Sequence, residues 1–545
     1  MGITLINCQS GDSFGSEQVE SDSREGLLSA VNRASTKLRA GLGESLASIQ
    51  KYDSPVEQAT TASLEALRSY SVGMKTRLAE GDQAAISLFA RATELDPNFA
   101  MAYARLGSGH YNIGEFELAK PALRKSYELH TGVSERERLY IDSHFYMMVT
   151  GELDKAIPIL ELWRQEYPRD PAPHTSLGFA YTALGQPEKA VREYEEALRL
   201  DPASGTTYLS LNGAYQMLNQ MDMAQEFLVQ AQARKISELL LIVPLYYMAF
   251  LRHDDEMMKN QVTKGAGQPD IENLLFAFQA NTEAYYGHLR DARRFSQRAV
   301  ESALHAGNRE NARGFRTEEA LRENEFGNLQ QARQYLSLAR ATNPDQPSWP
   351  FLAVILARTG ATNLALAIAR DLKRQAPLDT VMNNYWLPTI HAAVELHRGR
   401  PARAVELLQT VIPYELAIHP AWTTTDMFPV YLRGVAYLAA RQGAPAAIEF
   451  QKIIDCPGVV GNFFIGSLAR LGLARAYAME AGVSETPLTG VKQIRSAEFA
   501  ARRSEELAKA RSAYQDFFAL WKGADAEIPV IKQAQAEYRR LKSFP

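Results

Sequence analysis

Small residues recur along this chain at a nearly constant spacing, with apolar residues at helical intervals around them. The spacing is 34 residues, except for one interval of 37 between Ala119 and Ala156. The series consists of Ala85, Ala119, Ala156, Ala190, Ala224, Met258 and Ala292. A period of this length is typical of a helix–turn–helix unit, which cannot bury its apolar face alone and stacks on its neighbours. The pattern therefore predicts an array of helix pairs.

The unit between Pro171 and Pro202 is the most regular one. Its characteristic residues are Leu177, Gly178, Tyr181, Gly185, Ala190, Tyr194, Ala197 and Pro202. Gly178 and Ala190 are small where the two helices are expected to cross closely, and Gly185 relieves the backbone at a helix C-terminus. Spacing and residue types together resemble a tetratricopeptide repeat. The resemblance implies an all-α superhelix, an α-solenoid of about twelve helix pairs.

The regularity of the pattern divides the chain into segments. Ser134 and Glu137 form a capping-box pattern at the start of a helix, and turn glycines paired with small residues continue beyond residue 235. The predicted segments are 1–24, a remnant of a preceding α/β domain; 25–62, a linker helix; 63–235, regular repeats; 236–481, degenerate repeats; 482–503, an inserted polar segment; and 504–545, the last repeat helix and a capping helix over 528–541.

The N-terminal residues differ from the rest of the chain. Ile3 to Ile6 predicts a strand and Gln9 to Asp12 a turn, which together indicate a short β-hairpin. Because a lone strand is not stable, we expect this hairpin to be the remainder of a larger sheet. Residues 25–50 predict an amphipathic helix that ends before the break at 53–55.

Composition narrows the function only a little. The net charge of −4 over 545 residues gives no basic footprint, so nucleic acid is not expected as a partner. Cys8 and Cys456 match no metal spacing and indicate two reduced thiols. The longest apolar run, 239–251, contains Pro244 and is too short to cross a membrane. The start shows no signal peptide, so the chain as written is expected in the cytoplasm.

The sequence contains no recognisable catalytic motif. Phosphoryl transfer needs a glycine-rich loop, a lysine and two aspartates in known contexts, and none of these motifs is present. There is also no P-loop, nucleophile elbow or zinc-binding helix, and His391 and His397 fall on different faces of a helix. We therefore expect no enzymatic activity, no catalytic residues, no cofactor and no metal site.

Several segments resemble a bacterial family more closely than a generic repeat does. They are Leu42–Lys51, Glu57–Thr61, Ser63–Leu67, Asp96–Tyr103, Glu135–Ile141, Tyr167–Asp170 and Ala513–Phe517. The family is the acidobacterial-type serine/threonine protein kinases with C-terminal tetratricopeptide repeats, in which this region follows a membrane helix and a small α/β domain. The kinase domain has no counterpart in this sequence, so kinase activity does not carry over.

The first helix of each pair lines the concave face of such a solenoid, so aromatic, methionine and arginine side chains on it are candidates for binding a partner. The candidate groove residues are Tyr70, Met74, Arg77, Met101, Arg105, Tyr111, Phe145, Met148, Phe179, Tyr247, Phe250 and Phe278. Of these, Tyr111, Phe145 and Phe179 are expected to share one groove. The alternative, that individual side chains pack against a neighbouring repeat, stays open.

Two classes of function remain on this basis. The first is a protein-interaction scaffold or sensor region, linked by the resemblance to bacterial signal transduction, whose partner is a protein or peptide of unknown identity. The second is the C-terminal part of a kinase or of a winged-helix transcriptional regulator, with its activity in another domain. Coding sequence upstream of Met1 would distinguish them.

Overall fold

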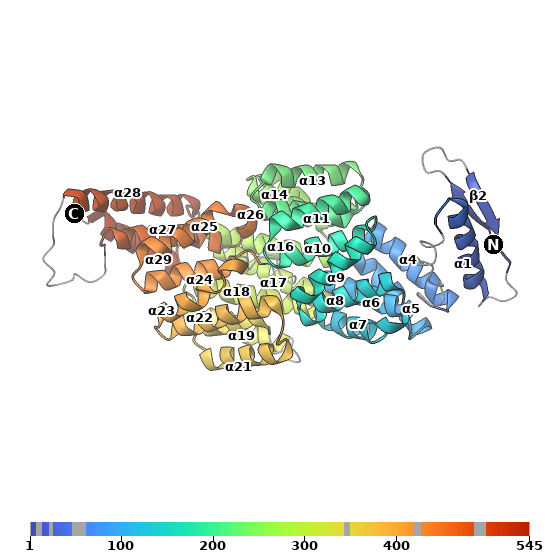
Figure 1. Cartoon of the computed structure of the whole chain (residues 1–545). Coiled ribbons are helices and arrows are strands. Elements are labelled where there is room, and N and C mark those ends of the chain that lie inside the picture. Colours follow the sequence, from blue (N-terminus) through green and yellow to red (C-terminus); the bar gives the residue numbers. More distant parts are fainter. Residues whose placement is uncertain are drawn as a thin grey trace. The chain divides into compact units, whose positions relative to one another are not determined.

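The structure is a computed structural model that describes residues 2–6, 13–20, 26–45, 61–342, 349–417, 427–483 and 497–543. These residues divide into two compact units, Met1–Pro173 and His174–Pro545. Within the described residues, helices form nearly all of both units, and strands occur only near the N-terminus (Figure 1). The predicted all-α class is therefore confirmed.

The N-terminal hairpin consists of β1 (Gly2–Ile6) and β2 (Ser13–Gln18), which pair antiparallel with Ile3 opposite Glu17. Helix α1 (Gly26–Gly41) packs on this hairpin, and a Cβ on Gly15 would lie 3.7 Å from Leu38. The predicted strand is confirmed. The helix expected over 25–50 was too long, because α1 already ends at Gly41. The turn expected at Gln9–Asp12 and the break at 53–55 lie outside the described residues.

Unit 1 continues as a succession of helices in which each first helix packs on the second helix of its pair. Ser134 caps one of them as predicted, because its Oγ accepts from the Glu137 N–H while Glu137 accepts from the Ser134 N–H. The elements are α4 (Leu64–Glu80), α5 (Asp82–Leu95), α6 (Ala100–Asn112), α7 (Phe116–Glu128), η1 (His130–Gly132), α8 (Glu135–Phe145), η2 (Tyr146–Thr150) and α9 (Leu153–Glu166).

Unit 2 repeats this arrangement, beginning within α10 (Pro171–Ala183). The pairs that follow continue through the degenerate part of the pattern. Their helices are α11 (Pro187–Leu200), α12 (Gly205–Met217), α13 (Met221–Ala233), α14 (Glu238–Leu251), α15 (Asp255–Gly265), α16 (Pro269–Tyr285), α17 (Leu289–His305), α18 (Arg309–Glu325), α19 (Leu329–Thr342), α20 (Pro350–Arg358), α21 (Thr362–Gln375), η3 (Met382–Trp386), α22 (Leu387–His397), α23 (Pro401–Gln409), η4 (Ile412–Tyr414), α24 (Phe428–Ala439) and α25 (Gly443–Asp455).

The C-terminal elements of unit 2 are α26 (Pro457–Val460), α27 (Ile465–Glu480), α28 (Ala497–Leu520) and α29 (Pro529–Ser543). Helix α28 runs without a break across residues 503 and 504, so the predicted boundary there was wrong: the charged segment and the last repeat helix are one element. Residues 484–496 of the expected insertion lie outside the described residues. Helix α29 lies where the C-terminal helix was expected.

The apolar run 239–251 forms α14, which packs against α15 as the first helix of a pair, as expected. None of the helices in the described ranges is both long and apolar enough to span a membrane.

The small residues of the 34-residue series lie at the crossings between paired helices. Six of them, Ala85, Ala119, Ala156, Ala190, Ala224 and Ala292, are fully buried, and Met258 is half-buried. A Cβ on Gly178 would lie 2.4 Å from the ring of Tyr194 across the crossing. A Cβ on Gly107 would approach Leu123 to 2.6 Å in the same way. The close approach of the helices therefore requires these small residues, which confirms the predicted register.

We expect Ala190→Leu to lower the free energy of unfolding by about 1–3 kcal/mol, because the crossing between α10 and α11 has no room for a larger side chain. Glu188 is exposed on the same helix, so Glu188→Leu is expected to change it by less than about 0.5 kcal/mol. Urea unfolding followed by circular dichroism measures both changes. Equal losses would show that the assigned register is wrong.

Two later segments of unit 2 cross earlier helix pairs. Residues 455–462 include α26, which contacts α12. Hydrogen bonds link the same segment to the Asn219 side chain after α12, to Tyr247 of α14 and to Phe278 of α16. Residues 521–530 contact the ends of α16 and α18, because Trp521 Nε1 donates to the Tyr285 carbonyl at 3.0 Å and the Val530 N–H donates to the Phe326 carbonyl at 3.1 Å. The chain itself therefore covers part of the face that its first helices form.

Candidate functional site

In unit 1, side chains from three consecutive first helices form a polar and aromatic row. Arg105 on α6 donates through Nη1 to the Tyr140 hydroxyl of α8 at 3.0 Å, and its guanidinium lies 4.3 Å from the centre of the Tyr140 ring. Tyr70 of α4 also lies close enough to raise the pKa of Arg105. We call Tyr70, Arg105 and Tyr140 the aromatic row. Sequence analysis predicted its first two members.

Charge in the aromatic row is concentrated on Arg105. Burial lowers the pKa of Arg105, but the two tyrosines and Asp82 together raise it by a larger amount. The net shift of the pKa is therefore upward, and the side chain stays cationic. His144 stacks on Tyr140 with ring centres 3.8 Å apart. Burial and the neighbouring arginine lower the pKa of His144 to about 3, so this imidazole is neutral at pH 7.

Most of the other predicted residues of unit 1 are half-buried beside aromatic or charged neighbours. Phe145 stacks on Tyr127 at 3.9 Å between ring centres, Tyr111 meets Phe116 edge-on at 5.0 Å, and Arg77 forms an ion pair with an aspartate. Met74 and Met148 are also half-buried. Met101 is instead buried in the core with 5% of its surface exposed, so its assignment to a groove was wrong. Met101 lies on the face of α6 that packs against neighbouring helices, so its side chain belongs to the core.

Unit 2 contains an apolar cavity of about 320 Å³ that brings together three predicted residues, Phe179, Tyr247 and Phe278. Its walls come from α10, α11, α12, α14, α16 and α26. The side chains and backbone that line it belong to Phe179, Thr182, Tyr194, Ser210, Asn212, Gly213, Ala214, Gln216, Met217, Val243, Pro244, Tyr247, Phe278, Gly458 and Val459.

The segment 455–462 closes one side of this cavity. The Tyr247 hydroxyl donates to the Gly458 carbonyl at 3.2 Å, and Asn462 Nδ2 donates to the Phe278 carbonyl at 2.8 Å. A Cβ on Gly458 would lie 2.2 Å from the Gln216 carbonyl oxygen, and one on Gly461 2.1 Å from the Tyr247 hydroxyl. Sequence reasoning missed this segment, although its two glycines between apolar residues are a signal of close backbone approach.

Phe250 was assigned to the groove, but it is buried and meets Tyr285 edge-on at 5.2 Å between ring centres. It packs between α14 and α16 because the two helices are close enough for their large side chains to interlock. The prediction was therefore wrong for Phe250, whereas Tyr247 and Phe278 reach the cavity wall.

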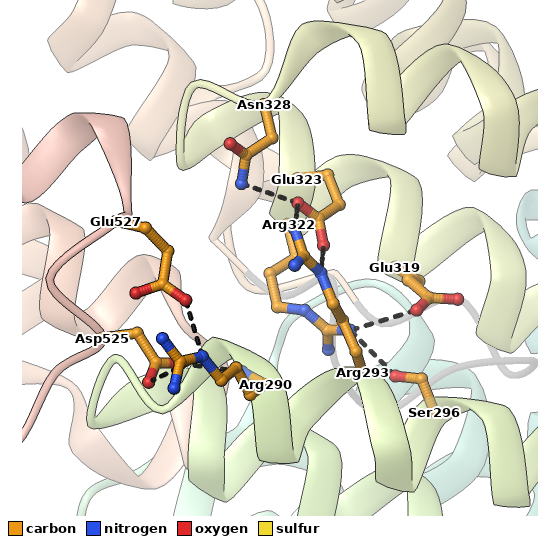
Figure 2. A network of polar contacts seen from close by, with 9 residues as sticks. All are labelled: Arg290, Arg293, Ser296, Glu319, Arg322, Glu323, Asn328, Asp525 and Glu527. Atoms are coloured by element: carbon orange, nitrogen blue, oxygen red, sulfur yellow. Dashed lines mark hydrogen bonds and ion pairs between the residues drawn. The ribbon is translucent and has the colours of Figure 1, made fainter.

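A network of charged side chains, buried at Glu323 and exposed at Arg290 and Glu527, connects α17 with α18 and with the C-terminal segment of unit 2 (Figure 2). Arg293 binds Glu323 through two hydrogen bonds of 2.6 and 2.8 Å, and Asn328 donates to the same carboxylate. Arg290 pairs with Glu527 at 2.6 Å, and its backbone N–H donates to Asp525. The carboxylates of Glu323, Asp525 and Glu527 each face an arginine of α17, which suits a role in holding these elements together.

A second group of charged side chains surrounds Arg433 on α24. Its Nη2 donates to Glu449 at 2.5 Å and to Glu415, and its Nη1 donates to the Leu408 carbonyl at 3.0 Å. Across the described residues, no group of three or more histidine, cysteine, aspartate or glutamate side chains is placed to hold a metal ion.

Comparison with known proteins locates one repeat directly. The tetratricopeptide repeat family model matches residues 171–204. Tetratricopeptide repeat protein 37 of Xenopus laevis is 28% identical over 134 residues, which is 24% of this chain and 8% of that protein. The chain therefore spans less than a tenth of the length of this relative.

Solved structures similar to this chain include the MamA protein and yeast Tom70. The MamA match is 24% identical, covers 31% of this chain and 92% of MamA, and has a TM-score of 0.20. The Tom70 match is 12% identical, covers 88% of this chain and 96% of Tom70, and has a TM-score of 0.26. Superpositions of this quality add nothing to the assignment of the repeats, which rests on residues 171–204 and on the helix pairs themselves. Together these two observations show a tetratricopeptide repeat at residues 171–204 within an α-solenoid of helix pairs.

Proposed function

We propose that this chain is a non-catalytic scaffold that binds a protein or peptide, and that the aromatic row of unit 1 contributes to the binding surface. Tetratricopeptide repeats imply protein interaction in general. The observation that supports this surface is the placement of the half-buried side chains of Tyr70 and Arg105 on consecutive first helices, where the buried ring of Tyr140 holds the guanidinium of Arg105.

The chemistry of the row favours an extended or helical peptide. Tyrosine rings offer apolar contact and arginine offers several N–H donors, the combination most enriched at binding hot spots. The Arg105 side chain as a whole is half-buried, and a carbonyl or carboxylate oxygen of a ligand would accept from guanidinium N–H groups that Tyr140 does not engage. The half-buried rings of Tyr111 and Phe145 extend the apolar part of the proposed surface.

The proposal predicts that Arg105→Met weakens peptide binding by at least about tenfold, since the variant keeps the aliphatic stem but removes the charge and the donors. Peptides selected from a random display library on the wild-type chain serve as ligands, and isothermal calorimetry measures their affinity. Arg124→Met is the matched control, because Arg124 is exposed on α7, the second helix of its pair.

Circular dichroism and the melting temperature establish that both variants fold. Equal affinity of the two variants for the selected peptides would contradict the proposal, as would selected peptides that bind the wild type and Arg105→Met alike.

The finer parts of the function rest on resemblance. The link to bacterial signal transduction is supported by the segments that resemble kinase-associated repeat regions, among them Asp96–Tyr103 and Glu135–Ile141. The cytoplasmic location expected from the sequence belongs to the same proposal. The prediction that Tyr111, Phe145 and Phe179 share one groove also stays a prediction; the first two lie in unit 1 and the third in unit 2.

A further inference from the structure

The apolar cavity of unit 2 is lined without charged side chains. None of the residues that line it is a lysine, arginine, histidine, aspartate or glutamate. Its wall is made mainly of aromatic and aliphatic side chains, including Phe179, Val243, Tyr247 and Phe278. A charged ligand would lose its hydration there without gaining an ionic partner, so the cavity disfavours ions.

Most polar side chains of the cavity wall are already hydrogen-bonded to the protein. Thr182 donates to the Gly178 carbonyl at 2.9 Å, Asn212 donates to the Ala224 carbonyl at 2.9 Å, and Gln216 donates to Asn212 at 2.9 Å. Tyr247 donates to the Gly458 carbonyl. The buried side-chain polar atoms that lack a partner in the described residues all belong to residues outside this wall. The cavity therefore offers a ligand mainly apolar contact.

The surroundings of Tyr194 agree with this description. Its hydroxyl contacts Thr182 and Ser210, and burial raises the pKa of Tyr194 to about 12, so the phenol stays neutral over the physiological range.

We infer that this cavity is a binding site for one small, uncharged and mainly hydrocarbon molecule, such as an aliphatic alcohol or an unsubstituted aromatic compound. Its volume of about 320 Å³ lies in the range of small-molecule sites, which are concave, mostly apolar and largely preformed. The site lies in unit 2 and is independent of the peptide surface proposed for unit 1.

A larger cavity of about 430 Å³ near the C-terminus does not have this character. Its wall includes Arg441, Arg475, Glu537 and Arg540, and Arg475 is paired with Glu537 at 3.0 Å. In this larger cavity an apolar ligand would have to displace water from charged groups, so we do not expect it to bind such a ligand.

Gly213 offers a way to fill the apolar cavity without disturbing its wall. It lies within α12, lines the cavity, and a Cβ placed on it would meet no atom within 4 Å. A leucine at this position can extend into the hollow, and replacing glycine inside a helix also favours the helical conformation.

The test measures binding of the uncharged fluorescent probe N-phenylnaphthylamine to the full chain, followed by competition with alcohols. We expect saturable binding of one probe molecule to the wild type, loss of affinity by at least about tenfold in Gly213→Leu, and unchanged affinity in Glu188→Leu, which adds the same side chain at an exposed site. The melting temperature of Gly213→Leu is expected to equal or exceed that of the wild type.

Competition on the wild type alone tests the inferred ligand class. Octanol is expected to displace the probe at least about tenfold better than octanoate, because the carboxylate is charged. Among straight-chain alcohols, affinity is expected to rise about fourfold for each added methylene until the cavity is full. Absence of saturable probe binding, full affinity in Gly213→Leu, or equal competition by octanol and octanoate would each overturn the inference.

Discussion

Replacing Arg433 by alanine is expected to lower the free energy of unfolding by about 3–5 kcal/mol, the usual result of breaking a buried ion pair from one side. Only 1% of the Arg433 side chain is exposed, and Glu449, its partner on α25, is buried as well. The substitution removes the hydrogen bonds to Glu449, Glu415 and the Leu408 carbonyl together. The two carboxylates would then face each other with Lys452 at 3.5 Å from each.

The measurement is the shift of the urea midpoint, together with hydrogen exchange of backbone amides. The loss of protection from exchange is expected to be largest in α24 and α25. Arg403→Ala is the matched control, because Arg403 pairs with Glu406 on the neighbouring α23 while both side chains are 60% exposed. An exposed pair of this kind contributes less than about 0.5 kcal/mol. Similar losses in both variants would show that Arg433 is not buried as described.

Glu319→Gln is expected to stabilise the protein at neutral and alkaline pH, by up to about 3 kcal/mol. Burial raises the pKa of Glu319 from 4.5 to about 7, with a smaller contribution from Glu323, while Arg322 and a hydrogen bond to Tyr335 act in the opposite direction. The carboxylate faces Arg322 at 3.8 Å, which is too far for a strong pair (Figure 2). Its charged form is therefore poorly compensated.

The direction of the pH dependence follows from the raised pKa. Between pH 4.5 and about 7 the folded protein holds a proton at Glu319 that the unfolded chain releases, so stability falls as the pH rises through this window. Below this pH window Glu319 is protonated in both the folded and the unfolded state. Above it, the folded protein bears the full free-energy cost of the buried, ionised carboxylate. The gain from Glu319→Gln is therefore expected to be absent near pH 4.5 and complete near pH 8.

Thermal unfolding of wild type and Glu319→Gln across this pH range measures the effect. Glu406→Gln, at the exposed pair on α23, is expected to show no such dependence. A Glu319→Gln variant that is less stable than wild type at pH 8 would mean that the carboxylate is ionised and compensated in the folded protein.

The aromatic row illustrates how far sequence reasoning about a site can reach. Tyr70 and Arg105 were predicted as members of a first-helix surface, but Tyr140 was not, although the three residues follow one another at intervals of 35 positions. Met101 and Phe250 were predicted for the same surface and are buried instead. Residue type does not separate these cases, because a methionine or phenylalanine suits a groove and a helix interface equally well.

The buried charges of α18 depended entirely on tertiary structure. Residues 309–325 alternate arginine, glutamate and asparagine with few apolar residues, a pattern that suits a solvated helix. The structure nevertheless buries Glu319, Arg322 and Glu323, because α17 and α19 pack around them and supply partners, among them Arg293 for Glu323 and Ser296 for Arg322. Burial of a charge is decided by its partners, and those partners come from other elements.

The sequence by itself determined the helix pairs and their register. A crossing such as that of Gly178 with Tyr194 joins residues within one repeat, so the size of the side chains there reports the geometry directly. Only the tertiary structure decided which parts of the first-helix face are covered. Tyr247 and Gly458 are 211 positions apart, and Phe278 and Asn462 are 184 apart. These contacts depend on the small rotation between successive repeats, accumulated over many repeats. A local sequence pattern does not determine this accumulated rotation.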